Sequence, residues 1–181
     1  MNPTMHGIWQ TPGPMVLSMA TPNYHDAALG LIDDCNELQI PCTVESLPEM
    51  PRADACRQKP FVISGALVRQ MQLGRTARPI WWIDADCAVR GLPHAIPDDR
   101  WMSLIDQYKT DYPVKSSVIF LRPCADSLEF LATWIAVLGA RWEDHWPMVR
   151  AWKNVTDQPR LEKGIFYSGH NWVKIDERRP A

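Results

Sequence analysis

The segment Ile80-Trp81-Trp82-Ile83-Asp84-Ala85-Asp86 constrains the fold of this chain more than any other, because four apolar side chains lead directly into two acids. A turn residue, Pro79, comes just before it. A short apolar run bounded by a turn and by acid is typical of a central strand. Similar apolar runs predict further strands over residues 15–20, 42–47, 101–105 and 118–121.

Helical patterns alternate with these strands. Residues 48–57 contain two prolines and are expected to form a loop, so the helix that follows would begin near Pro60 and stop at Gly74. The alternation predicts an α/β domain with a mixed, mostly parallel sheet flanked by helices. Further helices are expected over residues 24–38, with Thr21 as the N-cap, and from the capping-box pair Asp126 and Glu129 onward.

Composition narrows the class of protein. The chain has 181 residues, 46% of them apolar and 22% charged, which fits one globular domain. A net charge of −2 gives no electrostatic footprint for nucleic acid, and the longest apolar run, residues 130–140, is too short to span a bilayer. The five cysteines include no CxxC pair and the N-terminus shows no signal peptide, so we expect a cytoplasmic protein with reduced thiols. The sequence does not decide the oligomeric state, and a homo-oligomer is one of the open alternatives.

The two acids suggest a chemical use for the end of the central strand. Side chains at the carboxyl end of such a strand lie over the crevice where open α/β sheets bind ligands. Asp84 and Asp86 would repel each other there and lose solvation, which favours a bound cation. Carboxylate oxygens suit Mg²⁺ or Mn²⁺, and such a metal can neutralise the charge of a departing diphosphate. A solvated acidic turn without a ligand is the alternative interpretation of the same pattern.

Four segments follow one another along the chain: residues 15–35, Lys59-Pro60 leading into residues 79–89, residues 116–134, and Asp157-Gln158 with Leu161. In this order they make the chain resemble the GT-A nucleotide-diphospho-sugar transferases, the superfamily of glycogenin-like and galactosyltransferase-like enzymes. The resemblance implies a single compact GT-A-like (Rossmann-like) domain, with residues 15–105 as the nucleotide-binding half and residues 106–181 as the sugar and acceptor half. The sequence departs from the family pattern at Lys115-Ser116-Ser117, where Asn-Ala-Gly or similar is usual.

The same resemblance implies a metal-dependent glycosyltransferase with roles for individual residues. The donor would be a nucleoside-diphosphate sugar, with a UDP-sugar as the first expectation, and the acceptor could be a glycan, a protein or a small molecule. Asp86 would be the main ligand of Mn²⁺ or Mg²⁺, Asp84 would face the metal or the ribose, and His170 would be a further metal ligand. The remaining roles are Lys59 near the phosphates or the sugar, Ala20, Thr21 and Tyr24 beside the base, and Asp157 and Gln158 at the reaction centre.

The sequence also contains nine tryptophans, more than its tyrosines and phenylalanines together. Indole rings in the C-terminal segments can pack in the core, or they can offer flat apolar faces to the sugar rings of an acceptor. The residues concerned are Trp142, Trp146, Trp152 and Trp172.

Two other classes of protein stay open at this point. A Toprim-like metal-dependent nuclease or primase domain would use Glu45 together with Asp84 and Asp86 as metal ligands, although the weak charge footprint counts against it. A non-catalytic, nucleotide-binding relic of the GT-A fold would keep the pocket without turnover. Donor hydrolysis separates the relic from the enzyme, and DNA cleavage that depends on Glu45 would favour the nuclease.

Overall fold

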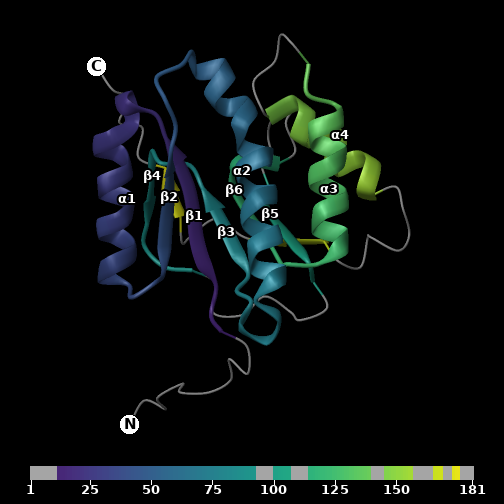
Figure 1. Ribbon diagram of the computed structural model, residues 1–181, viewed down its shortest axis with the longest axis horizontal. Helices are drawn as coiled ribbons and strands as arrows, with labels where there is room; N and C mark the ends of the chain where they lie inside the picture. The colour runs from purple at the N-terminus through teal and green to yellow at the C-terminus, as the bar shows by residue number, and fades with distance from the viewer. Residues whose placement is uncertain are drawn as a thin grey trace.

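A mixed sheet forms the centre of the protein in a computed structural model that describes residues 12–92, 100–106, 114–139, 145–156, 165–168 and 173–175. Within these residues the strands lie side by side in the order β2 (Cys42–Ser46), β1 (Met15–Ala20), β3 (Ile80–Ile83), β6 (Val114–Leu121), β5 (Met102–Asp106) and β7 (Ile165–Ser168) (Figure 1). β1 is parallel to β2 and β3, and β5 is parallel to β7. β6 is antiparallel to both of its neighbours. The predicted mixed, mostly parallel sheet is confirmed.

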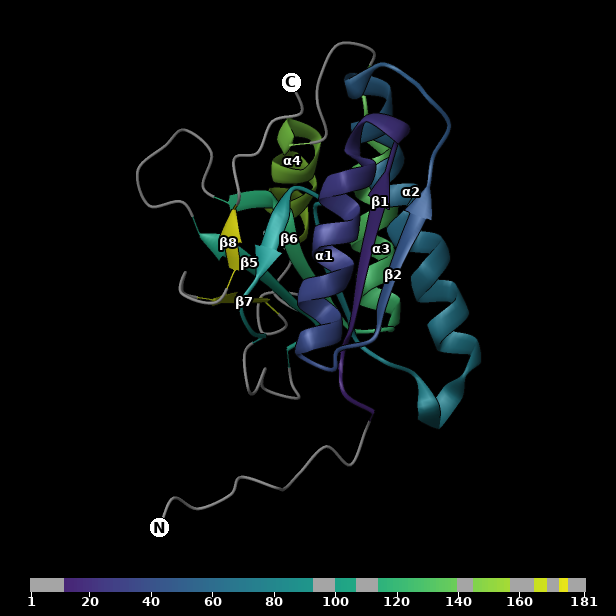
Figure 2. The ribbon, with the colours of Figure 1, turned by 90° about the vertical axis from the view of Figure 1, so that its left-hand side faces the viewer.

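Helices cover both faces of this sheet, as Figure 2 shows from the side. α1 (His25–Glu37), which follows a short 3₁₀ helix at Pro22–Tyr24, lies on one face. α2 (Arg52–Gln72) and α3 (Ala125–Ala136) lie on the other face, and α4 (His145–Thr156) packs against α3. A small second sheet, in which β4 (Cys87–Val89) pairs with β8 (Val173–Ile175), adjoins α1. The central strands are therefore covered on both sides, as uninterrupted apolar runs require.

Trp81 and Trp82 divide the core between the two faces of the sheet. Trp82 belongs to the apolar cluster under α2 and α3 that includes Phe130, whereas Trp81 belongs to the cluster under α1 that includes Leu31. The rings of Trp81 and Phe120 are 5.1 Å apart. Both indoles are only 1% exposed. Because successive residues of a strand point to opposite faces, β3 is buried on both of its sides, which fixes the strand that carries the two acids.

α2 begins earlier than the sequence predicts. The loop expected over residues 48–57 is wrong in its second half, because the helix starts at Arg52 and carries Pro60 in its interior. A proline inside a helix removes one backbone hydrogen bond and favours a bend. Figure 1 shows the first turns of α2 tilted against the rest of the helix. The stop predicted at Gly74 is close, since the helix ends at Gln72 and Gly74 takes a φ of +56°.

Several local predictions differ from the structure in smaller ways. The N-cap of α3 is Cys124 rather than a residue of the expected capping box, and Asp126 lies inside the first turn. Thr21 is the N-cap of the 3₁₀ helix and makes no capping hydrogen bond with its side chain. Trp146 and Trp152, considered as an acceptor platform, lie on α4 and pack half-buried against the core. Packing thus accounts for these two indoles.

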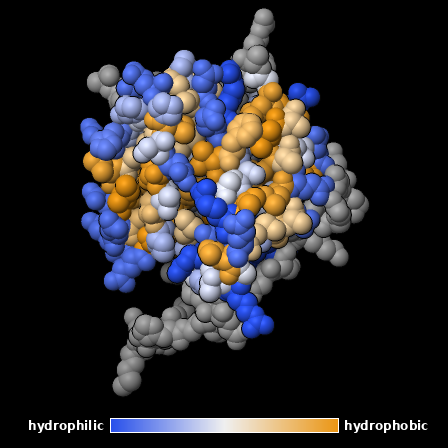
Figure 3. Space-filling model, in the orientation of Figure 1, coloured by the Kyte–Doolittle hydropathy of each residue, from blue (hydrophilic) through white to orange (hydrophobic). Residues whose placement is uncertain are grey.

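The face seen in Figure 1 carries apolar side chains, which Figure 3 shows gathered where α3 lies. Ala132 and Ala136 are exposed positions of α3. α2 exposes Phe61, Val68 and Met71 at helical spacing.

Among the described residues, no helix combines the length and the apolarity needed to cross a bilayer.

Candidate active site

A pocket opens where the parallel strands β1, β2 and β3 end. Residues that end or follow these strands line it, together with the start of the 3₁₀ helix and the first turns of α2. Its empty space, including the open mouth, is about 700 Å³. This edge of a parallel sheet is where open α/β folds bind ligands. The pocket brings together Ala20, Thr21, Tyr24, Lys59, Asp84 and Asp86, all of which the sequence predicts as site residues.

Asp84 begins a tight turn directly after β3. Its backbone N–H donates to the Ser117 carbonyl of β6 at 2.9 Å. The backbone N–H of Cys87 donates to the Asp84 carbonyl at 2.9 Å, which closes the turn over Asp84-Ala85-Asp86-Cys87. Aspartate is favoured at the first position of such turns. The turn and its anchor on β6 therefore hold both acids at one strand end.

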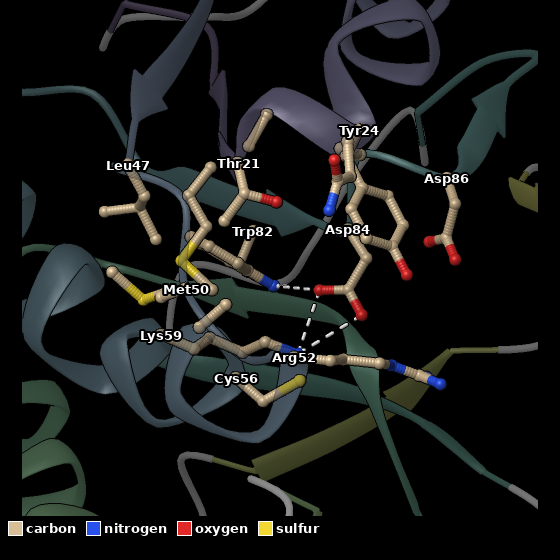
Figure 4. A pocket seen from close by; sticks show the side chains of 15 residues that line it. Thr21, Tyr24, Leu47, Met50, Arg52, Cys56, Lys59, Trp82, Asp84 and Asp86 are labelled. Carbon is tan, nitrogen blue, oxygen red and sulfur yellow. Dashed lines mark hydrogen bonds and ion pairs between the residues drawn. The ribbon is translucent and has the colours of Figure 1, made fainter. Parts of the chain in front are cut away.

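The Asp84 carboxylate interacts with two donors from the protein interior. The indole Nε1–H of Trp82 donates to Oδ1 at 2.7 Å, and Lys59 Nζ lies 2.9 Å from Oδ1 and 3.2 Å from Oδ2 (Figure 4). Lys59 is only 2% exposed, and it also donates to the Ser116 carbonyl at 3.1 Å. A buried charge is stable only when it is paired and hydrogen-bonded. Asp84 and Ser116 therefore permit a lysine on the inner face of α2.

Asp86 has a different environment from Asp84. It is half-buried, it lines the pocket, and within the described residues it makes no hydrogen bond or ion pair. The half-buried Tyr24 ring is directed into the same space (Figure 4). Two carboxylates only two residues apart thus differ in availability, because Asp84 is compensated by the protein while Asp86 can accept a ligand.

An apolar wall, which sequence reasoning missed, lies across the pocket from the two acids (Figure 4). Met19 contributes to it from the end of β1, and Leu47 and Met50 follow β2. Cys56 of α2 adds a third sulfur-containing side chain. Methionine side chains are flexible and polarisable, and they adapt to flat apolar groups. The wall gives the pocket a surface suited to an aromatic ring system.

The α2 side of the pocket could have been found from the sequence by helical spacing. Arg52, Ala55, Cys56 and Lys59 lie at i, i+3, i+4 and i+7 and all line the pocket. The prolines on both sides of this segment favour a loop by ordinary rules, which hides the shared face.

Cys87 is a packing residue rather than a nucleophile of the pocket. Burial raises the pKa of its thiol, and the carboxylates of Asp84 and Asp86 raise it further, while Lys59 and Lys115 act in the opposite direction. The residue is 3% exposed. A thiol in such surroundings stays protonated at neutral pH and is a poor nucleophile.

The remaining predicted site residues are either outside the described residues or away from the pocket. Asp157, Gln158 and His170 lie outside the described residues, so their roles stay predictions. Glu45 forms an ion pair with Arg69 at 2.8 Å and does not line the pocket. Across the described ranges, no three His, Cys, Asp or Glu side chains come together as a metal cluster. The Glu45, Asp84 and Asp86 set that a Toprim-like nuclease requires is therefore not assembled.

The donor atoms of the pocket suit a hard divalent cation that shares its ligands with a substrate. Mg²⁺ and Mn²⁺ prefer oxygen ligands, and Mg²⁺ is usually bound through one or two carboxylates plus substrate phosphates. Asp86 can supply a carboxylate oxygen, whereas both oxygens of Asp84 already interact with Lys59. The residues fit a cation completed by ligand oxygens better than a cage made of protein alone.

Comparisons with known proteins agree with the predicted fold. No protein-family model and no curated protein matches the sequence. The chain is similar to the crystal structure of a glycosyltransferase involved in the glycosylation of the major capsid of PBCV-1, with a TM-score of 0.62 and 16% identity over 87% of this chain and 82% of that one. It is also similar to the apo form of the glycosyltransferase GlyE of Streptococcus pneumoniae TIGR4, with a TM-score of 0.50 and 8% identity over 81% of this chain and 44% of GlyE. The protein has a GT-A-like glycosyltransferase fold.

Proposed function

We propose that this protein is a glycosyltransferase that moves a sugar from a nucleoside-diphosphate sugar to an acceptor. The observation that carries the proposal is the position of Asp84 and Asp86 in a pocket at the carboxyl ends of β1, β2 and β3. The fold around this pocket is similar to that of a glycosyltransferase over 87% of the chain. Site and fold thus point to the same class of reaction.

The donor would lie along the pocket from its apolar wall to its acids. Thr21 and Tyr24, with Ala20, would border the base, and the wall formed by Met19 and its neighbours would cover one face of it. The diphosphate would then reach the end of the pocket where Asp84 and Asp86 lie. On this assignment residues 15–105 hold the nucleotide, and residues 106–181 supply the sugar and acceptor side.

The residues of the chain would divide the chemistry between them. A bound Mn²⁺ or Mg²⁺ would neutralise charge on the departing diphosphate, held by Asp86 with His170 as the predicted further ligand. Lys59 fixes the Asp84 carboxylate in one orientation, which would present it to the ribose or the metal. Asp157 and Gln158 would face the sugar.

In the transfer step, a hydroxyl of the acceptor attacks the anomeric carbon. The bond between that carbon and the diphosphate breaks, and the diphosphate leaves with the electron pair. An inverting reaction needs a general base that takes the hydroxyl proton, and Asp157 is the predicted candidate.

Titration calorimetry tests the proposal with UDP, GDP and ADP, each in Mn²⁺ and in EDTA. We expect at least one of them to bind the wild type, and EDTA to weaken that binding by about tenfold or more because a cation–phosphate contact is lost. Asp86→Asn keeps the size of the side chain without its charge, so this variant should bind the nucleoside diphosphate with the same affinity in Mn²⁺ and in EDTA.

Asp33→Asn is the matched control, since Asp33 is an exposed acid on α1 that does not line the pocket. It should bind like the wild type. Equal affinity of the wild type and Asp86→Asn in Mn²⁺ would contradict the metal site. Failure of every nucleoside diphosphate to bind the wild type would contradict the proposed function.

A further inference from the structure

The charged side chains that line the described pocket are Arg52, Lys59, Asp84 and Asp86, two cations and two carboxylates. The Lys59 ammonium lies against both oxygens of Asp84 and the Ser116 carbonyl, so its charge is largely compensated within the protein. A nucleoside diphosphate brings several negative charges into this space, next to the carboxylate of Asp86. A further cation beside the phosphates would offset this repulsion.

Arg52 is in a position to provide that cation. It is the first residue of α2, it is exposed, and it shares one helical face with Cys56 and Lys59. Figure 4 shows its side chain extending past Lys59 toward the side of the pocket where Asp86 lies. The early start of α2 brings it there, because a loop over residues 48–57 would not fix this face toward the pocket.

We propose that Arg52 binds the diphosphate of the donor, an inference that rests on the proposed function above. A guanidinium is planar, always charged and able to donate two parallel hydrogen bonds to phosphate oxygens, which an ammonium cannot do. Arg52 lies on the exposed side of the pocket and Lys59 on its buried side. On this assignment Lys59 positions Asp84, and Arg52 is the cation that contacts the phosphates directly.

The base for this test, uracil, guanine or adenine, is that of the nucleoside diphosphate that binds the wild type. The test compares the affinities for that nucleoside diphosphate, the matching monophosphate and the matching nucleoside. In Mn²⁺, Arg52→Ala should weaken diphosphate binding by about tenfold or more, since a charge-assisted contact is removed. The loss should be smaller for the monophosphate and absent for the nucleoside. Arg52→Lys should recover part of the loss.

Arg75→Ala is the matched control, because it removes the same charge beyond the far end of α2, at a residue that does not line the pocket. It should bind like the wild type. An Arg52→Ala variant with wild-type affinity for the diphosphate, or with an equal loss for diphosphate and nucleoside, would overturn the inference while the proposed function stands. Absence of binding by the wild type would instead overturn the proposed function, and the inference with it.

Discussion

The two sides of the pocket differ in how they use charge. The pocket floor (Lys59, Trp82 and Asp84) is held together by contacts within the protein, with Lys59 2% exposed and Trp82 1% exposed. The pocket rim (Arg52, Tyr24 and Asp86) is half-buried or exposed and faces the open space.

The difference between floor and rim gives the two acids of the short motif Asp84-Ala85-Asp86 separate roles. The first acid, Asp84, completes a buried ion pair, and its removal should cost stability. The second acid, Asp86, makes no hydrogen bond or ion pair within the described residues and is available to a ligand. The distinction between the two regions is therefore tested by the stability of variants. A floor variant that folds as stably as the wild type, or a rim variant that loses much stability, would contradict it.

The largest effect is expected for Lys59→Met, which keeps an unbranched side chain only one heavy atom shorter but removes its charge. The carboxylate of Asp84 would lose its cation while remaining mostly buried, at 29% exposure of its side chain. We expect a loss of about 3 kcal/mol in the free energy of unfolding, measured by urea denaturation.

The double variant Lys59→Met with Asp84→Asn is the control for this prediction. Because it also removes the uncompensated charge, it should recover a large part of the lost stability. If the stability loss of the double variant instead equals the sum of the losses in the two single variants, the ion pair does not stabilise the floor.

A smaller loss is expected for Trp82→Phe. The variant keeps an aromatic ring in the core but removes the indole N–H that donates to Asp84 at 2.7 Å. We expect a loss of about 2 kcal/mol from the missing hydrogen bond and the smaller ring. Trp81→Phe, on the opposite face of β3, is the matched control. In double-mutant cycles with Asp84→Asn, we expect a coupling energy for Trp82→Phe and none for Trp81→Phe. Coupling energies of the same size in the two cycles would contradict the hydrogen bond between Trp82 and Asp84.

The smallest effect on folding is expected at the rim. Asp86→Asn should change the free energy of unfolding by no more than about 0.5 kcal/mol, as for other substitutions away from packed or paired groups. The same variant should lose the metal-dependent part of nucleotide binding. A stability loss comparable to that of Lys59→Met would place Asp86 in the floor and remove the distinction between the two regions.

The parts of the site that the sequence predicts are those encoded by neighbouring residues. The apolar run of β3 and the turn Asp84-Ala85-Asp86-Cys87 follow from local pattern, and so do the strand end at Ala20 and the start of the first helix. The GT-A-like fold itself is predicted by the resemblance of four ordered segments, two of which lie beyond β3 at residues 116–134 and at Asp157-Gln158 with Leu161.

The parts that could not be predicted depend on contacts between distant residues. Lys59 meets Asp84 across 25 positions and Ser116 across 57 positions, so no local pattern indicates that its charge is compensated. Helix α2 begins earlier than predicted, because the prolines of residues 48–57 favour a loop and Pro60 favours a helix start, whereas here Pro60 lies in the interior of the helix. Arg52 follows from helical spacing only once α2 is known to begin before Pro60, so it is not among the predicted site residues.

Hydrolysis of nucleotide sugars tests the central claim most directly, because glycosyltransferases that lack an acceptor can transfer the sugar to water. Release of nucleoside diphosphate from UDP-, GDP- and ADP-sugars would be measured in Mn²⁺ for the wild type, Asp86→Asn and the control Asp33→Asn. We expect the wild type and Asp33→Asn to turn over at least one donor, and Asp86→Asn to lose that activity by about a hundredfold or more. No turnover of any donor by the wild type, with nucleotide binding intact, would contradict the account and leave a binding protein with a glycosyltransferase fold.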